Sequence, residues 1–164
     1  MNYGRYALMI AASTVIMFGL MYLNTFEVGH VFFSQTRMWM ALLMGATMAI
    51  VMLSFMWKMY PSKPANLAIL VGAAIVFAGS LWLVRSQATV DDVSYMEAMI
   101  PHHSIAVLTS SRANIRDPRV RELANEIIEA QLREIDEMKA LIADLRQNPT
   151  PAGAPALPPN PDPE

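Results

Sequence analysis

The sequence contains no cysteine, and only 16% of its 164 residues are charged. The missing cysteine excludes disulfides, thiolate metal sites, c-type haem attachment and cysteine nucleophiles. No stripe of basic side chains with interleaved aromatic residues is present, so we expect no nucleic acid as a partner. Any metal site in this chain must therefore be built from methionine, histidine and carboxylate or amide oxygen.

Apolar residues make up 54% of the chain and are concentrated in its first half. Three apolar segments predict transmembrane helices over residues 6–23, 38–57 and 65–84, each close to the ~20 residues that cross a bilayer. The first segment is not followed by a small-x-small cleavage site, so we interpret it as a retained helix rather than a signal peptide. Residues 1–88 are thus predicted to anchor the chain in a lipid bilayer.

Basic residues near the span ends predict the orientation of this anchor. Arg5, Lys58 and Lys63 share one side of the membrane, whereas Arg37 and Arg85 lie on the other. The positive-inside rule then places the N-terminus inside and the segment after residue 85 outside.

A ridge of methionines follows the second span, with one methionine on each successive turn: Met40, Met44, Met48, Met52 and Met56. Thioethers spaced in this way suggest sites that pass a soft metal ion along the helix. Methionine is also a flexible apolar residue that packs well between helices. The sequence leaves both interpretations open.

Residues 89–147 predict an antiparallel helical hairpin outside the membrane, so the whole chain is all-α. Thr89 is the expected N-cap of the first helix, which should run to about residue 113 and kink at Pro101. Asp117 as N-cap and Pro118 at the first helical position start the second helix, which should end near residue 146. Residues 148–164 are rich in proline and predict a disordered tail.

The second helix of the hairpin offers two candidate core stripes. The first follows alternating spacings of four and three: Val120, Ala124, Ile127, Gln131, Glu134, Met138, Leu141 and Leu145. It places two polar side chains in the core, which costs free energy unless they are paired. In the alternative register, Ile128, Ile135 and Ile142 face inward.

A candidate metal site begins in the first helix of the hairpin. Met96, Met99 and His103 share one helix face through their i, i+3, i+7 spacing. Thioether sulfur with imidazole is a donor mixture that suits Cu(I), and by the same softness Ag(I). Counting back from the turn near residue 115 brings this face against Gln131, Glu134 and Met138, with the two oxygen-bearing side chains as auxiliary donors. The alternative is that these methionines and histidines only pack.

Two runs carry a family resemblance: Tyr95-Met-x-x-Met-Ile-Pro-His-His-Ser, and Gln131-x-x-Glu-Ile-x-x-x-Met. The chain resembles the bacterial domain-of-unknown-function family numbered 305, in its three-span membrane-anchored form. The resemblance implies a ferritin-like helical domain that binds copper outside the cytoplasm and is linked to copper tolerance. It implies a ligand set of Met96, Met99, His102, His103 and Met138. It also implies a bacterial inner-membrane location, with the hairpin in the periplasm.

Soluble members of this family carry two such hairpins in a four-helix bundle, whereas this chain has one. We therefore expect a ferritin-like half-bundle completed by a homodimer. The predicted function is copper sequestration or handover, with other copper-handling proteins as further partners. We expect no enzymatic activity, because the second helix has no histidine with which to build a di-iron centre. The alternative function is a non-catalytic interaction or dimerisation module.

Overall fold

The computed structural model describes residues 2–151 and 153–158, and every regular element in this part of the chain is helical. The long helices are α1 (Tyr3–Leu20), α2 (Gln35–Phe55), α3 (Lys63–Ser86), α4 (Asp92–Arg112) and α5 (Pro118–Gln147), with short 3-10 turns at Val28–His30 (η1) and Trp57–Met59 (η2). The prediction of an all-α chain is confirmed. The last helix ends at Gln147, directly before the predicted tail. Residue 152 and residues 159–164 of that tail lie outside the described residues.

Helices α1, α2 and α3 form a three-helix bundle, hereafter the anchor, and all three are long and apolar enough to cross a membrane. α2 is the central helix because it packs against both α1 and α3. In its most apolar stretch 28% of residues are buried, compared with 6% in each of the other two. Most of the anchor surface is therefore exposed in the single chain, and it is apolar enough to face lipid.

Small residues let the anchor helices approach closely. Gly45 of α2 faces Thr14 of α1, and a Cβ atom at position 45 would collide with the threonine side chain. At the end far from α4, the Tyr3 hydroxyl donates to Asn66 Oδ1 at 2.8 Å. Asn66 is fully buried, and its side chain also donates to the Tyr60 carbonyl. These contacts tie α1 to α3 and to the α2–α3 connection at that end.

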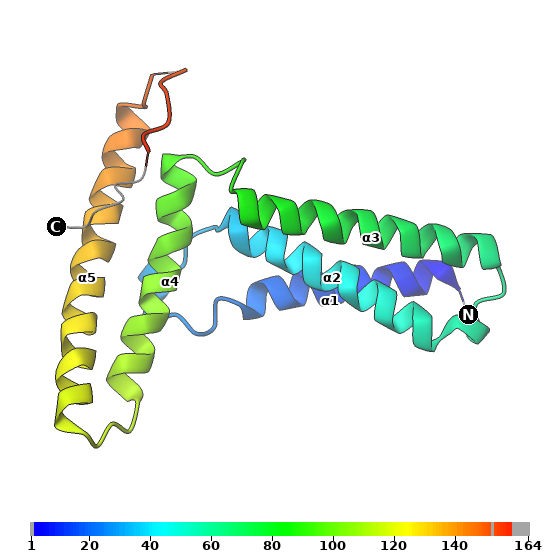
Figure 1. Cartoon of the computed structure of the whole chain (residues 1–164), viewed down its shortest axis with the longest axis horizontal. Helices are drawn as coiled ribbons and strands as arrows, with labels where there is room; N and C mark the ends of the chain where they lie inside the picture. The colour runs from blue at the N-terminus through cyan, green and yellow to red at the C-terminus, as the bar shows by residue number, and fades with distance from the viewer. Residues whose placement is uncertain (1, 152, 159–164) are drawn as a thin grey trace.

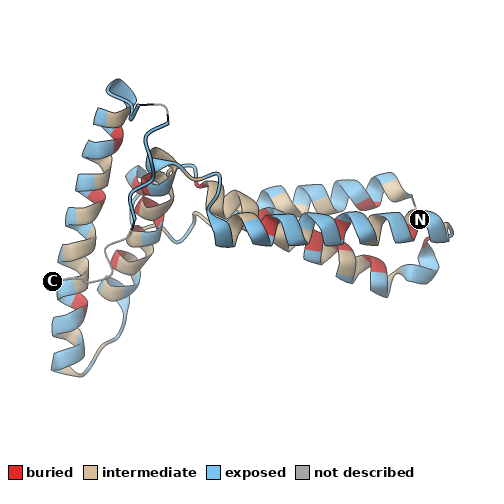
Figure 2. Cartoon of the chain, turned by 45° about the horizontal axis from the view of Figure 1, so that its top comes forward, coloured by how far each residue is buried: buried red, intermediate tan, exposed pale blue. Residues whose placement is uncertain are grey.

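Helices α4 and α5 form an antiparallel pair, hereafter the hairpin, which lies across one end of the anchor (Figure 1). The chain N-terminus and the α2–α3 connection lie at the other end, as the predicted topology requires. α4 is the hairpin helix next to the anchor, and α5 lies on its far side. Because no strand or further helix among residues 2–151 and 153–158 covers them, large parts of both hairpin helices remain exposed (Figure 2).

The hairpin core uses the second of the two predicted stripes. Ile100 and Ile135 are fully buried and pack with Met96 and Ile142, and Phe32 from the α1–α2 connection packs against this cluster. The first stripe is in the core only in part: Ala124 is buried and Met138 and Leu145 pack against the cluster, whereas Val120 is 49% and Leu141 46% exposed. Full burial of the polar residues in that stripe would cost them their hydrogen bonds to water, whereas the isoleucines of the other stripe have no polar group to bury.

Polar side chains cap the hairpin helices. Asp91, rather than the predicted Thr89, is the N-cap of α4, and its carboxylate accepts from the Ser94 amide at 2.8 Å. Asp117 caps α5 as predicted, with Pro118 at its first position. A carboxylate is a better acceptor than a hydroxyl at the positive end of a helix dipole, which favours Asp91 over Thr89. α4 continues through Pro101 without a break in helical assignment.

Candidate metal centre

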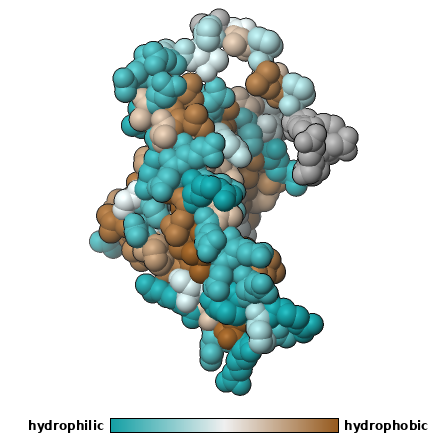
Figure 3. All heavy atoms as spheres, turned by 90° about the vertical axis from the view of Figure 1, so that its left-hand side faces the viewer, coloured by the Kyte–Doolittle hydropathy of each residue, from teal (hydrophilic) through white to brown (hydrophobic). Residues whose placement is uncertain are grey.

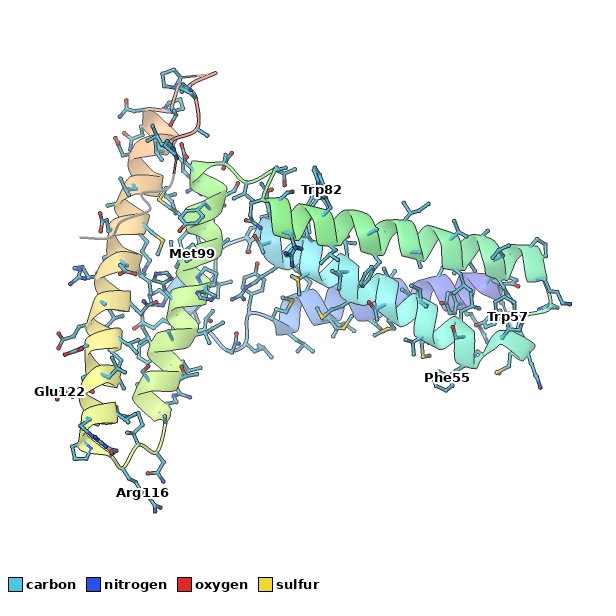
Figure 4. All side chains as sticks on the ribbon, in the orientation of Figure 1. Phe55, Trp57, Trp82, Met99, Arg116 and Glu122 are labelled. Carbon is cyan, nitrogen blue, oxygen red and sulfur yellow. The ribbon has the colours of Figure 1, made fainter. Side chains whose placement is uncertain are left out.

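A pocket of about 430 Å³ opens between α4 and α5 near the open end of the hairpin. Its lining includes three thioethers, one imidazole and three carboxylates: Met96, Met99, Met138, His103, Asp92, Glu134 and Glu137. Tyr95, Leu141 and Leu145 complete the wall. Figure 4 shows Met99 between the two helices. Five of the seven residues that the sequence predicts as a metal site thus line one pocket.

The three thioethers reach the pocket from both helices. Met96 and Met99 lie one turn apart on α4, and Met138 faces them from α5. Met96 is only 7% exposed and belongs to the hairpin core, where Met138 packs against the same cluster. The side chains are therefore held by packing before any ligand arrives, which reduces the entropy lost on binding.

His103 is held at both ring nitrogens. Nδ1 lies 3.0 Å from the Met99 carbonyl oxygen, and Nε2 lies 2.7 Å from Glu134 Oε2. The Met99 carbonyl and the Glu134 carboxylate both accept, so Nδ1 donates to the first and Nε2 to the second. Nε2 is the nitrogen that could face a metal ion, in place of the hydrogen that it now gives to Glu134. Glu134 stands in that position here. Its side chain is 43% exposed, so the carboxylate has room to rotate away or to share the metal.

Two predicted site residues lie outside this pocket. The exposed His102 lines a separate hollow of about 220 Å³ on the side of α4 that faces the anchor, where Arg37 and Gln87 also contribute. Its ring centroid is 6.1 Å from that of His103, and Met99 lines both hollows. Gln131 is half-buried on α5 and is not part of the pocket wall. The 100° turn between adjacent helical residues explains why the two histidines diverge.

The charge around the pocket favours a cation. Asp92 and Glu137 were not predicted as site residues, yet they bring two further carboxylates to the wall, which contains no lysine or arginine. Within the described residues, no three histidine, aspartate or glutamate side chains are grouped closely enough to hold a metal ion. A metal in this pocket therefore depends on the thioethers, with the carboxylates supplying a favourable field.

The α1–α2 connection is joined to α4 beside the pocket by a buried polar contact. The Phe26 amide donates to Ser104 Oγ at 2.7 Å, and Ser104 Oγ lies 3.0 Å from His30 Nδ1. His30 is 4% exposed and Ser104 is fully buried. Burial lowers the pKa of His30, nearby Lys139 lowers it further, and Glu27 and Asp136 act in the opposite direction. A neutral ring accepts from the Ser104 hydroxyl at Nδ1.

Sequence reasoning missed this contact. His30 is separated from Ser104 by 74 positions, and although Ser104 ends the Tyr95–Ser104 motif, nothing in that motif points to His30. The one available signal was a histidine in a short connection between two apolar spans. The contact fixes the position of α4 relative to the anchor, and with it the pocket.

Residues 92–162 match a family model described as "Domain of unknown function (DUF305)". The chain is also 31% identical over 145 residues to "Uncharacterized protein L153" of Acanthamoeba polyphaga mimivirus, an alignment that covers 87% of this chain and 93% of the viral protein. No solved structure matches the chain. The family predicted from the methionine–histidine motifs is confirmed: the chain belongs to the DUF305 family.

Proposed function

We propose that the hairpin binds Cu(I) in the pocket between α4 and α5, and that the anchor holds this site at a membrane surface. The observation that carries the proposal is the convergence of three thioethers and one imidazole from two helices on a single pocket. Thioethers are poor ligands for hard cations and good ligands for Cu(I). Ag(I), which is equally soft, is expected to occupy the same site.

The residues have distinct tasks in this proposal. Met96, Met99 and Met138 supply sulfur, and His103 supplies Nε2 once the Glu134 carboxylate has moved from its present position at 2.7 Å. The Met99 carbonyl keeps the imidazole in the required tautomer. Glu134 remains close enough to act as an auxiliary oxygen donor or to attract the incoming cation. Gln131 and His102 fall outside this set, because neither lines the pocket.

Sequestration or handover of copper fits this site better than catalysis. The pocket is open to solvent on one side, so an ion has a path in and out without a large rearrangement. Three basic residues on the N-terminal side against two on the hairpin side favour an extracytoplasmic hairpin, periplasmic in a bacterial inner membrane. A copper-handling partner would then meet the protein at the exposed outer face of the hairpin.

The competing proposal is a hairpin in which these side chains only pack. It is favoured by one observation, the burial of Met96 within the hairpin core. The two proposals differ in what a volume-conserving change does. Replacing Met99 or Met138 by leucine keeps the apolar volume and removes the sulfur.

The deciding experiment is an anaerobic Cu(I) titration of the full chain in detergent against a competing chromophoric chelator. We expect one tight site that is lost in the double variant Met99→Ala, His103→Ala and weakened at least tenfold in Met138→Leu. Met48→Leu, in the anchor, is the matched control and should leave the affinity unchanged. Equal affinity in the wild type and the double variant would overturn the proposal and leave a packing role.

A further inference from the structure

The side of the hairpin on which the pocket opens continues along α5 as a face that carries exposed and half-buried apolar side chains and two glutamates. Residues at alternating spacings of three and four share this side: Val120, Leu123, Ile127, Ala130, Glu134, Glu137 and Leu141. The last three line the pocket. Val120, Leu123 and Leu141 are 49%, 55% and 46% exposed, and Tyr95 of α4 joins them at 55%. Figure 3 shows apolar surface running between charged side chains on the outer side of the hairpin.

We propose that this pocket face is the contact surface between two copies of the chain, and that the partner hairpin closes the pocket. The two α5 helices would pack antiparallel about a two-fold axis along the membrane normal. Such an axis reverses the direction of any helix that lies in the membrane plane, and the hairpin lies across the end of the anchor (Figure 1). A two-fold contact uses the same face on both copies, so one apolar face is sufficient.

Charge along the hairpin matches this arrangement. The turn end, residues 112–122, carries four arginines and two acidic residues. The opposite end carries four acidic residues, one lysine and one arginine over residues 134–147, and three more acidic residues over 91–97. Antiparallel pairing places the basic end of each copy beside the acidic end of its partner. Parallel pairing would place like charges together, which disfavours it.

The size of the face is adequate for a stable dimer. α5 contains 30 residues, which corresponds to a helix about 45 Å long, and two helices side by side are about 20 Å wide. α4 contains 21 residues and is about 32 Å long, so at a width of about 10 Å each the two helices present about 770 Å² per copy. This area is close to the ~800 Å² per partner of ordinary specific interfaces. Anchoring both copies in one membrane at the same height raises their effective concentration further.

The consequence for the metal pocket rests on the proposed function. In one copy the pocket wall is open to water, whereas the partner's apolar residues would cover it in the dimer. Covering the site removes competing water and slows the escape of a bound ion. The partner arginines lie beside the acidic end in this arrangement, where they balance the charge of Asp92, Glu134 and Glu137.

The interface is tested with single cysteines, because the chain has none of its own. Ala130 lies on the pocket face near the middle of α5, and Leu132, 38% exposed, lies at the same level about 160° round the helix. In liposomes with a metal chelator and a mild oxidant, full-length Ala130→Cys should form a disulfide-linked dimer and Leu132→Cys should not. Cross-linking of Leu132→Cys alone, or of neither variant, would overturn the interface.

Charge reversal tests the antiparallel arrangement and the closure separately. Arg112→Glu with Arg116→Glu should lower the cross-linking yield of Ala130→Cys several-fold, and an unchanged yield would contradict antiparallel pairing. In the cysteine-free protein, the same two changes should speed the release of Ag(I) to a chelator several-fold. If the two changes weaken the dimer but leave the rate of Ag(I) release unchanged, the partner hairpin does not close the pocket. If neither form binds Ag(I) although Ala130→Cys still cross-links, the proposed function fails and the interface stands.

Discussion

The buried contact between Ser104, His30 and Phe26 leads to a prediction about how α4 is held on the anchor. Ser104 is fully buried, and its hydroxyl is the partner of both the Phe26 amide at 2.7 Å and His30 Nδ1 at 3.0 Å. Ser104→Ala removes one small polar group and leaves two others without a partner. The change should therefore loosen the α1–α2 connection without disturbing the hairpin core.

The size of the effect follows from the burial of the two orphaned groups. A buried polar group left without a hydrogen bond costs about 1–3 kcal/mol. Phe26 lies near the surface at 36% exposure, so water can replace part of the hydrogen bond that its amide loses. His30 is only 4% exposed, so its unpaired Nδ1 accounts for most of the lost stability. We take about 2 kcal/mol for the sum. Because 1.4 kcal/mol corresponds to a factor of ten, local opening should become about 30-fold more frequent.

Amide hydrogen exchange over residues 24–34 measures this opening directly. In full-length protein, Ser104→Ala should raise the exchange rate of the protected amides in this segment about 30-fold, with much smaller changes in α5. Ser111→Ala is the control, because Ser111 is exposed on the same helix and its hydroxyl bonds only to the nearby Leu108 carbonyl. Equal exchange in wild type and Ser104→Ala would refute the role given to this contact.

Three further predictions concern stability. Because burial lowers the pKa of His30, the folded chain binds fewer protons than the unfolded chain, so protection of residues 24–34 should be complete above the ordinary value of 6.5 and decline as pH falls below it. A pH-independent exchange profile between pH 5 and 7, once corrected for intrinsic rates, would contradict this sign. Ile135→Ala removes a fully buried side chain and should cost about 2–5 kcal/mol in chemical denaturation of the hairpin. A loss below about 1 kcal/mol would show that Ile135 is not in the core. Gly45→Ala forces Thr14 to move and should lower the thermal midpoint in detergent, whereas Gly79→Ala, with open space around it, should leave it unchanged or raise it. Equal midpoints for the two variants would contradict the close approach of α1 and α2.

Much of the fold was predictable because strong local signals agreed with one another. The three apolar spans, the Asp117-Pro118 helix start and the methionine–histidine spacing each specify their structure within a few residues of chain. The observed spans begin and end within about three residues of the predicted ones, the usual uncertainty at helix ends. Prediction of the start of α4 failed by two residues, since three polar candidates for the cap stand close together in the sequence.

The relation between the two hairpin helices was less predictable. Counting from the turn brought the face of Met96, Met99 and His103 against Gln131, Glu134 and Met138, and the structure places Glu134 and Met138 in the pocket wall but not Gln131. Residues 113–117 are not helical, and extended residues advance the chain about twice as far as helical ones, so a count from the turn gives the level only to within about one helical turn. The choice of α5 stripe depended in turn on which side α4 occupies. The same choice leaves Val120 and Leu141 of the other stripe exposed, and both belong to the proposed dimer face.

The contact of His30 with Ser104 was not predictable at all from one sequence. It joins a connection between spans to a helix that begins more than sixty residues later. No periodicity or spacing links the two segments, because their approach is set by how the hairpin docks on the anchor. Contacts of this kind become visible only once the tertiary arrangement is known.

X-ray absorption spectroscopy of the full-length protein loaded with one equivalent of Cu(I) tests the central claim most directly. The structure predicts a copper environment dominated by sulfur scatterers with one imidazole nitrogen, and the sulfur contribution should fall in Met99→Leu and in Met138→Leu. The imidazole signal should disappear in His103→Ala and remain in His102→Ala. A spectrum of nitrogen and oxygen ligands alone, unchanged in the two leucine variants, would contradict a thioether metal centre in this hairpin.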